Sequence, residues 1–574
     1  AKSKLWVVSA LLSLVLISGV IIAVQIRRAG RLPAPLPMQT IRPGNFGNVL
    51  DATISPDGNM IAFVRRNAGR YSLKIRQLDS NSETQLIPES EALCWGLRFS
   101  YDGSQVYYLI TEKNSTISVL YRLDVQGGVP AKLTVNIDTP IALSPDGVRF
   151  AFCRRYPTQR KDALIVADAD GASEREIAVR QHPETFALTS AAWSPDGKLI
   201  ALGATTSSEG SFKLVGVSVD DGQVKELTPE EWTGTRGFAW ARNGKSLFFI
   251  AGKHDTSGLE VWRLAYPGGA VVRLTNDPVN YEEISLTRDG KTMVAMQVSR
   301  PSNLWTTSLA DESSQQLLRG DGKELAGVQM LSGNRLAYTL IDKGLSNIWT
   351  ADADGSNPKQ LTSAGAAHPA ASPNGEYLVF AGLQEKARHL WRLNLKDSEL
   401  QQLTYGAGED FPSFSPDGKW IVYTSLSADR YTLWRAPLTG GEPTQLTKEG
   451  LATQPSVSPD GRLIACAYRT DSTTPWKIAL LPVTGGTPIK TLGIPYAINQ
   501  IIRWSPDSKS LLYLDSPKGV SNVWRLPLSG DKAEALTQFS AESIFGYQFS
   551  GDGKQLISAR GTITRQVIIF TNPG

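Results

Sequence analysis

Side chains that could perform acid–base, nucleophilic or metal chemistry are few in this sequence, and their spacing fits no catalytic motif. The 574 residues include four histidines and three cysteines. No CxxC or HExxH spacing and no Gly-x-Ser-x-Gly motif occurs, although zinc sites, zinc proteases and α/β-hydrolases respectively depend on these arrangements. We therefore expect no enzyme activity, no cofactor and no metal site.

A small set of polar side chains could instead bind a ligand. They occur where we expect loops to lead into the first strand of a repeated unit: Glu282, Glu283, His368, Asp410, Gln454 and Gln500. Such loops commonly carry binding residues because a rigid scaffold positions them. The set is rich in hydrogen-bond acceptors, which suits a cationic or hydrogen-bonding ligand. The alternative is that each residue is an ordinary solvated loop residue.

The cysteines are interpreted as structural. Cys153 and Cys466 lie in the apolar runs Phe150–Cys153 and Leu463–Cys466, and a free cysteine in such a run usually behaves as a small buried hydrophobic residue. Cys94 precedes Trp95 and is less clear. Three cysteines without paired spacing exclude a disulfide framework.

These candidate residues belong to an internal repeat. The sequence Ser-Pro-Asp-Gly occurs five times, and weaker copies begin at Ser100, Ala241, Thr287, Leu331, Ser372, Ser505 and Ser550. The fourth position of these twelve copies recurs every 45 residues on average, within a range of 42 to 50. Repeats of this length are typical of β-propeller blades.

The ninth copy shows what one unit contains. Short strands are predicted at Pro412–Ser415, Trp420–Thr424, Tyr431–Pro437 and Pro443–Thr447. Between the first two, Pro416-Asp417-Gly418 predicts a turn, because Pro presets φ, Asp accepts from nearby backbone N–H groups and Gly tolerates positive φ. Four short antiparallel strands repeated in this way describe a propeller blade.

The motifs also resemble a known family. Ser-Pro-Asp-Gly-Lys, an apolar residue followed by Trp, and Gly-Gly-x-Pro-x-x-Leu-Thr resemble the WD40-like (PD40) repeats of TolB-like propellers. Related blades occur in the non-catalytic half of dipeptidyl peptidase IV-type enzymes. The resemblance covers about residues 38–570 and implies an all-β fold of twelve four-stranded blades.

Twelve blades exceed the four to eight of a typical ring. We therefore expect two six-bladed propellers, over residues 38–320 and 321–574, and a division into five and seven remains open. The last unit has no fourth strand, and residues 38–42 could supply it. If they do, the two rings are nested rather than sequential.

The N-terminal segment has a different character. Residues 5–26 contain no charged side chain, and 22 helical residues span about 33 Å, enough for the hydrocarbon core of a bilayer. We expect a flank at 1–4, a single transmembrane helix at 5–26 and a linker at 27–37; the alternative for 5–26 is a cleaved signal peptide. Charges on both sides leave the orientation open.

The charge balance argues against nucleic-acid binding. The net charge of +4 includes five basic and no acidic residues within 1–31. The remaining 543 residues therefore carry a net charge of −1. A basic surface is the usual footprint of a nucleic-acid-binding protein, so we expect none in the propellers.

The order of anchor, linker and TolB-like repeats resembles the C-terminal half of bacterial membrane receptors. In these, a serine/threonine kinase or a CadC-type winged-helix domain precedes the span. The resemblance implies an extracytoplasmic, periplasmic sensor for a protein or small-molecule ligand, with the cytoplasmic effector upstream and outside this chain. The alternative is a TolB-like envelope scaffold that docks other proteins, and a peptidase accessory propeller ranks third.

Overall fold

The computed structural model describes residues 38–573 except 114, 183, 206–210, 254–257, 278, 343, 364, 385–386, 428–429, 472–473, 494–500, 517–519, 531 and 551. These residues form β-strands and one 3-10 turn, Pro157–Gln159. No helix long and apolar enough to span a bilayer is found among them. The predicted transmembrane helix, its flank and linker, and Gln500 lie outside the described residues.

All strands of the described chain belong to twelve four-stranded antiparallel sheets, which confirms the predicted all-β fold of four-stranded units. Five sheets are built from β2–β21 in chain order. Their strands are β2 (Val49–Ile54), β3 (Met60–Asn67), β4 (Arg70–Gln77), β5 (Glu83–Ser90), β6 (Leu93–Phe99), β7 (Gln105–Thr111), β8 (Ser118–Asp124), β9 (Ala131–Val135), β10 (Ala142–Leu143), β11 (Arg149–Tyr156), β12 (Lys161–Asp168), β13 (Arg175–Gln181), β14 (Ala192–Trp193), β15 (Leu199–Thr205), β16 (Phe212–Ser218), β17 (Val224–Glu226), β18 (Gly234–Trp240), β19 (Ser246–Gly252), β20 (Glu260–Ala265) and β21 (Val271–Arg273).

Five further sheets are built in the same way from β26–β45. Their strands are β26 (Glu324–Leu331), β27 (Arg335–Asp342), β28 (Leu345–Asp352), β29 (Lys359–Gln360), β30 (Ala366–Ala371), β31 (Tyr377–Gln384), β32 (Ala387–Asn394), β33 (Leu400–Gln402), β34 (Glu409–Phe414), β35 (Trp420–Ser427), β36 (Arg430–Pro437), β37 (Thr444–Gln445), β38 (Leu451–Val457), β39 (Leu463–Arg469), β40 (Lys477–Pro482), β41 (Lys490–Leu492), β42 (Arg503–Trp504), β43 (Ser510–Asp515), β44 (Asn522–Pro527) and β45 (Glu534–Ala535).

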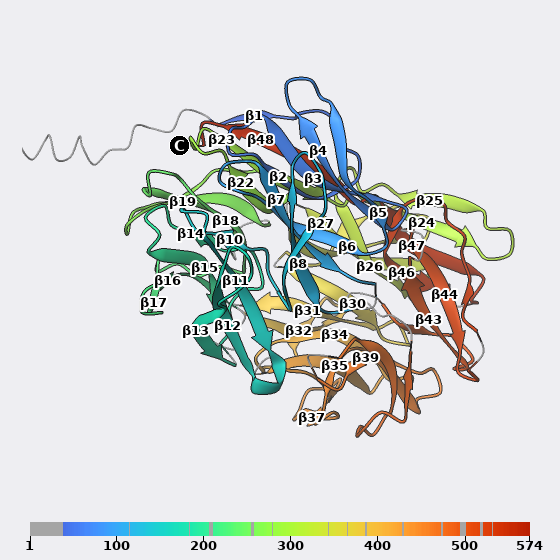
Figure 1. Cartoon of the computed structure of the whole chain (residues 1–574). Helices are drawn as coiled ribbons and strands as arrows, with labels where there is room; N and C mark the ends of the chain where they lie inside the picture. Colours follow the sequence, from blue (N-terminus) through green and yellow to red (C-terminus); the bar gives the residue numbers. More distant parts are fainter. Residues whose placement is uncertain are drawn as a thin grey trace, which may run out of the picture.

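The remaining two sheets combine strands that are distant in sequence. One has the order β1-β48-β23-β22, formed by β1 (Gln39–Ile41), β48 (Thr564–Thr571), β23 (Thr292–Ser299) and β22 (Asn280–Leu286). The other has the order β25-β24-β47-β46, formed by β25 (Ser314–Leu318), β24 (Ser302–Ser308), β47 (Gln555–Gly561) and β46 (Ser543–Phe549). Figure 1 shows red β48 beside blue β1 and green β23. We call these two the composite sheets.

The composite sheets depart from the sequential division expected at residue 320. Thr40 pairs with Phe570, and Ala295 pairs with Ile568. Leu304 pairs with Ala559 in the other composite sheet. Strands from both sides of residue 320 therefore share sheets. The backbone groups on one edge of β23 pair with β22 and those on the other edge with β48, while β24 pairs with β25 on one edge and with β47 on the other. The strand predicted within residues 38–42 is β1, and it pairs with the last strand.

The predicted turn between the first two strands of a unit has the expected geometry. In the ninth copy, Gly418 N–H donates to the Ser415 carbonyl at 3.0 Å, and Gly418 has a φ of +69°. The Ser415 hydroxyl donates to Asp417 at 2.6 Å, and Lys419 N–H donates to the same carboxylate oxygen at 3.1 Å. Each side chain of the motif thus satisfies a backbone or side-chain group within the turn.

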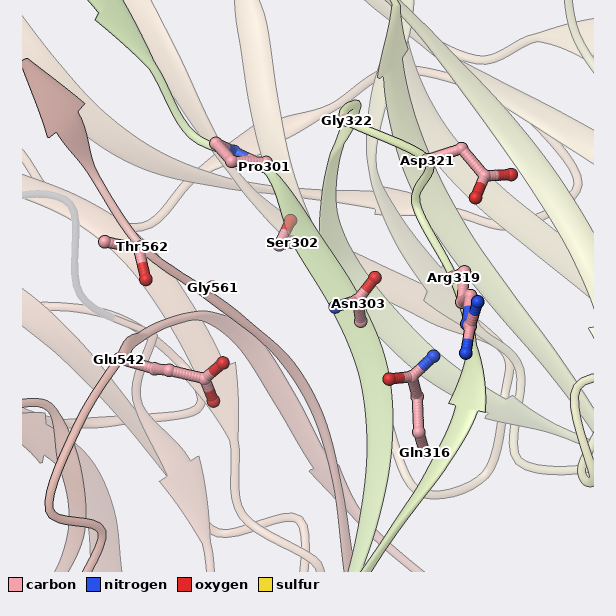
Figure 2. A pocket seen from close by; sticks show the side chains of 10 residues that line it. All are labelled: Pro301, Ser302, Asn303, Gln316, Arg319, Asp321, Gly322, Glu542, Gly561 and Thr562. Atoms are coloured by element: carbon pink, nitrogen blue, oxygen red, sulfur yellow. The ribbon is translucent and has the colours of Figure 1, made fainter.

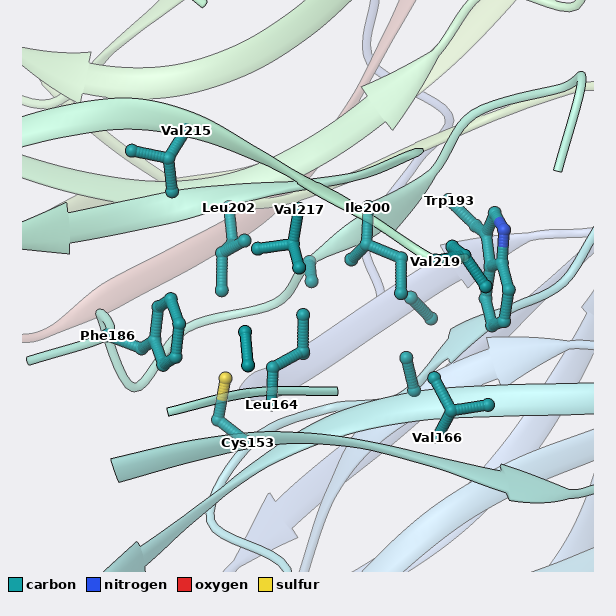
Figure 3. Packing of buried hydrophobic residues seen from close by; sticks show 14 of the residues in the cluster. Cys153, Leu164, Val166, Phe186, Trp193, Ile200, Leu202, Val215, Val217 and Val219 are labelled. Carbon is teal, nitrogen blue, oxygen red and sulfur yellow. The ribbon is translucent and has the colours of Figure 1, made fainter. Parts of the chain in front are cut away.

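The core is divided among clusters that lie between neighbouring sheets. In one of them, Cys153 and Leu164 from β11 and β12 face Leu202 and Val215 from β15 and β16, as Figure 3 shows. A single sheet cannot bury its own apolar face, so each unit depends on its neighbours. All three cysteines are buried and free, and burial raises the pKa of the Cys153 thiol.

Candidate functional site

A cavity of about 450 Å³ lies where the inner strands of six sheets converge. Its lining comes from the ends of β2, β6, β10, β14, β18 and β22 and from the turns that follow them. The second residue of every one of these turns contributes: Pro56, Tyr101, Pro145, Pro195, Arg242 and Arg288. The turn sequence therefore sets the chemistry of this opening, which we call the arginine cavity.

The arginine cavity carries charge of one sign. Arg98, Arg242 and Arg288 line it, and no Asp or Glu is among the described residues of its wall. The rest of the wall is largely aromatic or aliphatic, with rings contributed by Phe99, Tyr101, Trp193, Phe238 and Trp240. A cavity with cationic groups set in an aromatic wall suits a ligand that joins an acidic group to an apolar one.

The arginines are held in different ways. Arg98 donates to the Leu97 carbonyl at 2.7 Å and to Glu283 at 3.0 Å, which fixes its guanidinium. Arg288 donates to the carbonyl of Tyr101, 187 residues away in sequence. Arg242 is exposed. An acidic ligand would therefore meet two arginines whose side chains are already oriented, which lowers the entropic cost of binding.

The indole N–H groups of the two tryptophans are satisfied by the protein backbone. Trp193 donates to the Gly197 carbonyl at 2.9 Å, and Trp240 donates to the Ala192 carbonyl at 3.2 Å. Trp240 also meets Tyr266 edge to face at 5.0 Å between ring centres. What these residues offer a ligand is consequently their apolar ring surface rather than a hydrogen bond.

A buried carboxyl group lies behind Arg98. Asp51 is 5% exposed and accepts a hydrogen bond from Leu97 N–H at 3.0 Å. Burial, and next the charge of Glu283, raise the pKa of Asp51 from its ordinary value of 3.8 to about 6. Because the folded state favours the protonated form, ionised Asp51 opposes folding above that pH.

This gives a stability prediction for Asp51→Asn. The amide oxygen can still accept from Leu97 N–H, but no charge is buried at neutral pH. We expect the free energy of unfolding to rise by up to about 3 kcal/mol near pH 7.5, and the gain to shrink between about pH 6 and 4 as wild-type Asp51 becomes protonated. Urea titrations of the wild type and Asp51→Asn at pH 7.5 and at pH 4 measure the two free energies of unfolding. A gain in stability that is the same at both pH values would contradict the prediction.

The two predicted glutamates lie on β22, just before the residues of that strand that line the arginine cavity. Both occur at an irregularity of β22, where pairing with β23 shifts between Tyr281 and Ile284. Glu283 accepts from Arg98 and, at 3.2 Å, from the Ser190 hydroxyl. Glu282 lies 3.6 Å from Arg565 of β48. Glu283 thus positions a cavity residue, whereas Glu282 pairs with a neighbouring strand.

Three other predicted residues lie on a different group of sheets. His368 is in β30, Asp410 in β34 and Gln454 in β38. The structure brings His368 and Asp410 together, with Nδ1 of the imidazole 2.6 Å from Oδ1 of the carboxylate. Gln454 N–H donates to the Thr424 hydroxyl at 3.0 Å. The predicted residues are therefore distributed over two places, and Gln500 lies outside the described residues.

The sequence contains a signal for the arginine cavity in the second position of its repeated turn. The acceptor-rich residues predicted as a binding site lie elsewhere in the repeat. Seven of the twelve copies of the turn have Pro at the second position, but the weaker copies at Ser100, Ala241 and Thr287 have Tyr101, Arg242 and Arg288 there. All three side chains line the cavity. Non-proline residues at the second turn position therefore predict the cavity lining better than the loops that precede the first strands do.

A second, polar pocket of about 380 Å³ lies where the chain crosses between the composite sheets. Figure 2 shows Glu542 on one side of it and Arg319 and Asp321 on the other. At its base, a Cβ on Gly561 would lie 2.0 Å from the Pro301 carbonyl oxygen, so only glycine allows the two crossing segments to approach this closely. We interpret this pocket as part of the crossing.

Comparison with known families identifies propeller repeats over most of the described chain. Residues 99–400 match the prolyl oligopeptidase N-terminal β-propeller domain, and residues 331–486 match the TolB β-propeller domain. The TolB homolog of Chlorobium chlorochromatii (strain CaD3) is 30% identical over 119 residues. The match covers 19% of this chain and 24% of that relative, so the chain spans about a quarter of the relative's length.

The solved structures to which the chain is similar share little sequence with it. The tricorn protease is 12% identical with a TM-score of 0.34, covering 91% of this chain and 61% of that one. A putative TolB from Agrobacterium tumefaciens is 15% identical with a TM-score of 0.25, covering 68% and 94%. The β-propeller domain of the trilobed protease from Pyrococcus furiosus is 15% identical with a TM-score of 0.26, covering 62% and 96%.

Proposed function

The chain belongs to the family of β-propellers that includes the N-terminal domain of prolyl oligopeptidases and the PD40 repeats of TolB, and from this we propose that it is a non-enzymatic binding propeller that docks an acidic segment of a partner protein. The family matches concern propeller domains, which are the non-catalytic part of such peptidases. Catalysis would need a nucleophile motif that the sequence lacks.

The observation that carries the proposal is the arginine cavity. Six sheets contribute to its wall, its charged lining residues are all arginine, and aromatic rings surround them. Arginine is the side chain best suited to carboxylate recognition because its planar guanidinium donates in pairs. A partner segment with Asp or Glu beside an aromatic or aliphatic residue would satisfy both parts of the wall.

We propose that the twelve sheets form two six-bladed rings. Six core clusters lie between successive sheets from β2–β5 to the composite sheet of β22, β23 and β48, and the last of them returns to β2–β5. Six others connect the β24–β25–β46–β47 sheet and the five sheets of β26–β45 in the same cyclic way. The second ring, residues 302–561, is then inserted within the first.

The cellular setting is part of the proposal. A TolB-like scaffold would act in the periplasm, and residues 5–26 would hold it to the membrane. This interpretation rests on the TolB-type repeats. The sensor role stays a prediction. It would require, in addition to the same binding propeller, a kinase or winged-helix domain upstream.

Selection of peptides tests the proposal and does not require an identified partner. Random twelve-residue peptides are selected on the protein, and the enriched sequences are compared. We expect enrichment of Asp and Glu next to apolar residues. The double variant Arg242→Glu/Arg288→Glu should bind these peptides at least about 10-fold more weakly, a loss of about 1.4 kcal/mol.

The control for this test changes the same charge at turns outside the arginine cavity. Lys419 and Lys554 follow turns of the same repeat in other sheets, and both are exposed. Lys419→Glu/Lys554→Glu alters the net charge equally and should leave binding unchanged. Selected peptides without acidic residues, or equal loss in both double variants, would refute docking in the arginine cavity.

A further inference from the structure

A second place in the fold has the features of a small-ligand site, away from the arginine cavity. The inner strands β30, β34 and β38 each have an irregularity in their pairing with the next strand. At these irregularities His368, Phe411 and Gln454 have φ values of +52°, +53° and +55°. Three successive sheets therefore place a non-glycine residue in the left-handed region at the corresponding point of the inner strand.

Other sheets use glycine at this point. Gly96, Gly237 and Gly327 lie at the pairing irregularities of β6, β18 and β26, with φ values of +70°, +34° and +57°. A residue with a Cβ costs roughly 1 to 2 kcal/mol in this conformation, and such strain is concentrated at functional sites. His368 and Phe411 bear this backbone cost where other sheets have glycine, which indicates that their side chains make interactions that offset it.

The side chains of His368 and Phe411 form a group with those of Asp410 and Arg388. The His368 and Phe411 rings are in contact in a tilted arrangement, with 4.2 Å between their centres and 31° between their planes. Asp410 accepts from Phe411 N–H at 2.8 Å, lies 2.6 Å from His368 Nδ1 and accepts from Arg388 Nη1 at 3.0 Å. One carboxylate thus orients both an imidazole and a guanidinium.

The charge balance leaves this group able to accept an anion. Burial alone would raise the pKa of Asp410, but His368 and Arg388 outweigh it and lower the pKa to about 2, so the carboxylate is ionised. The nearby His389 and Glu409 pair with each other at 2.8 Å, with Glu409 buried. Among the described residues, one available carboxylate therefore faces two groups that can carry positive charge.

Both cationic groups are accessible. The His368 side chain is 38% exposed and the Arg388 side chain is 42% exposed, while Asp410 between them is 22% exposed. Since Nδ1 of His368 is held by the carboxylate, Nε2 is the nitrogen left for a ligand. An oxyanion that accepts from protonated Nε2 and from a second guanidinium nitrogen would complete the charge balance.

We propose that His368 and Arg388, positioned by Asp410, form a binding site for a small oxyanion, carboxylate or phosphate, with the His368–Phe411 pair as its aromatic wall. The site lies on β30, β32 and β34 and is distinct from the arginine cavity on β2–β22. Binding should increase protonation of His368, because an anion stabilises the imidazolium form.

The four histidines make a direct test possible. The full chain is labelled with ¹⁵N-histidine, and acetate, benzoate, inorganic phosphate and phenyl phosphate are titrated at constant ionic strength. We expect the ring signals of His368, assigned with His368→Gln, to move toward the protonated form with millimolar affinity. The four anions separate carboxylate from phosphate recognition and show whether the aromatic wall contributes.

Three variants separate binding from folding. Arg388→Gln should weaken the binding at least about 10-fold, whereas Arg525→Gln on an exposed pair with Glu534 should not. His368→Gly introduces the residue that other sheets use at this point, so it should abolish anion protection against thermal unfolding without lowering the melting temperature of the free protein. Signals of His368 that do not respond to any anion, or respond equally in Arg388→Gln, would overturn the proposal.

The outcome is independent of the arginine cavity. Arg242→Glu/Arg288→Glu should leave the anion response of His368 intact, because those residues line a cavity formed by other sheets. Loss of the His368 response in that double variant would show that the anions act through the arginine cavity and would also overturn the proposal.

Discussion

A fragment of residues 302–561 is expected to fold without the rest of the chain, whereas the fragment 321–574 is not. The first contains every strand of six sheets, from β24 to β47. The second lacks β24 and β25, so β47 loses its partner strand β24. In the full chain, Leu304 and Trp305 of β24 pair with Ala559 and Ser558 of β47. Half of a composite sheet would then be missing, and the core next to it would be exposed.

Circular dichroism and hydrogen exchange on both fragments measure this difference. We expect a cooperative thermal transition and protected amides in β47 for the fragment 302–561, and broad, weakly protected behaviour for 321–574. The fragment 38–320 should also fail to fold by itself, because β23 lacks β48. Cooperative folding of both 38–320 and 321–574 would show that the sequential division is the physical one.

Phe570→Ala is expected to be among the most destabilising single substitutions, although it lies four residues from the C-terminus of the sequence. Phe570 is 1% exposed, and it packs with Phe248 and Ile250 of β19 in the neighbouring sheet and with Tyr281 of β22 in its own sheet. Removal of a buried Phe side chain costs about 3 to 5 kcal/mol, from lost burial and from the cavity left behind.

Denaturant unfolding of the full chain measures this loss. The control is Gln566→Ala on the same strand, where the side chain is exposed and a change within about 0.5 kcal/mol is expected. If Phe570→Ala cost no more than Gln566→Ala, β48 would contribute little to the core, and the joining of the two chain ends in one sheet would have little energetic meaning.

Local sequence signals predicted the units of the fold. The turn at Ser415–Gly418 and the strands on either side of it depend on short-range chemistry: the Ser hydroxyl, the Asp carboxylate and a glycine with positive φ all act within six residues. The strand within residues 38–42 is predicted from the repeat pattern, because the last unit lacks a fourth strand. The repeat pattern leaves open whether this strand pairs with the last unit, as β1 does with β48.

The candidate site was only partly predictable. The sequence predicts His368 and Asp410 as loop residues that precede first strands; both lie within the first strands, β30 and β34, and their side chains meet at 2.6 Å. The sequence does not predict Arg388 as a site residue, because it lies on the third strand of its sheet and nothing in its local sequence distinguishes it. Its proximity to Asp410, 22 residues away on β34, follows from the packing of β32 against β34, which belongs to the next sheet.

By itself, the sequence determined the repeat, its four-stranded unit and the turn that links the first two strands, because these depend on contacts between residues close in the chain. Only the tertiary structure decided which strands complete the composite sheets and which turns meet around one cavity. Arg98 and Glu283 are 185 residues apart, and their 3.0 Å contact exists because separate sheets converge on a common centre. Such contacts depend on how units pack against one another, and no local pattern of residues encodes that arrangement.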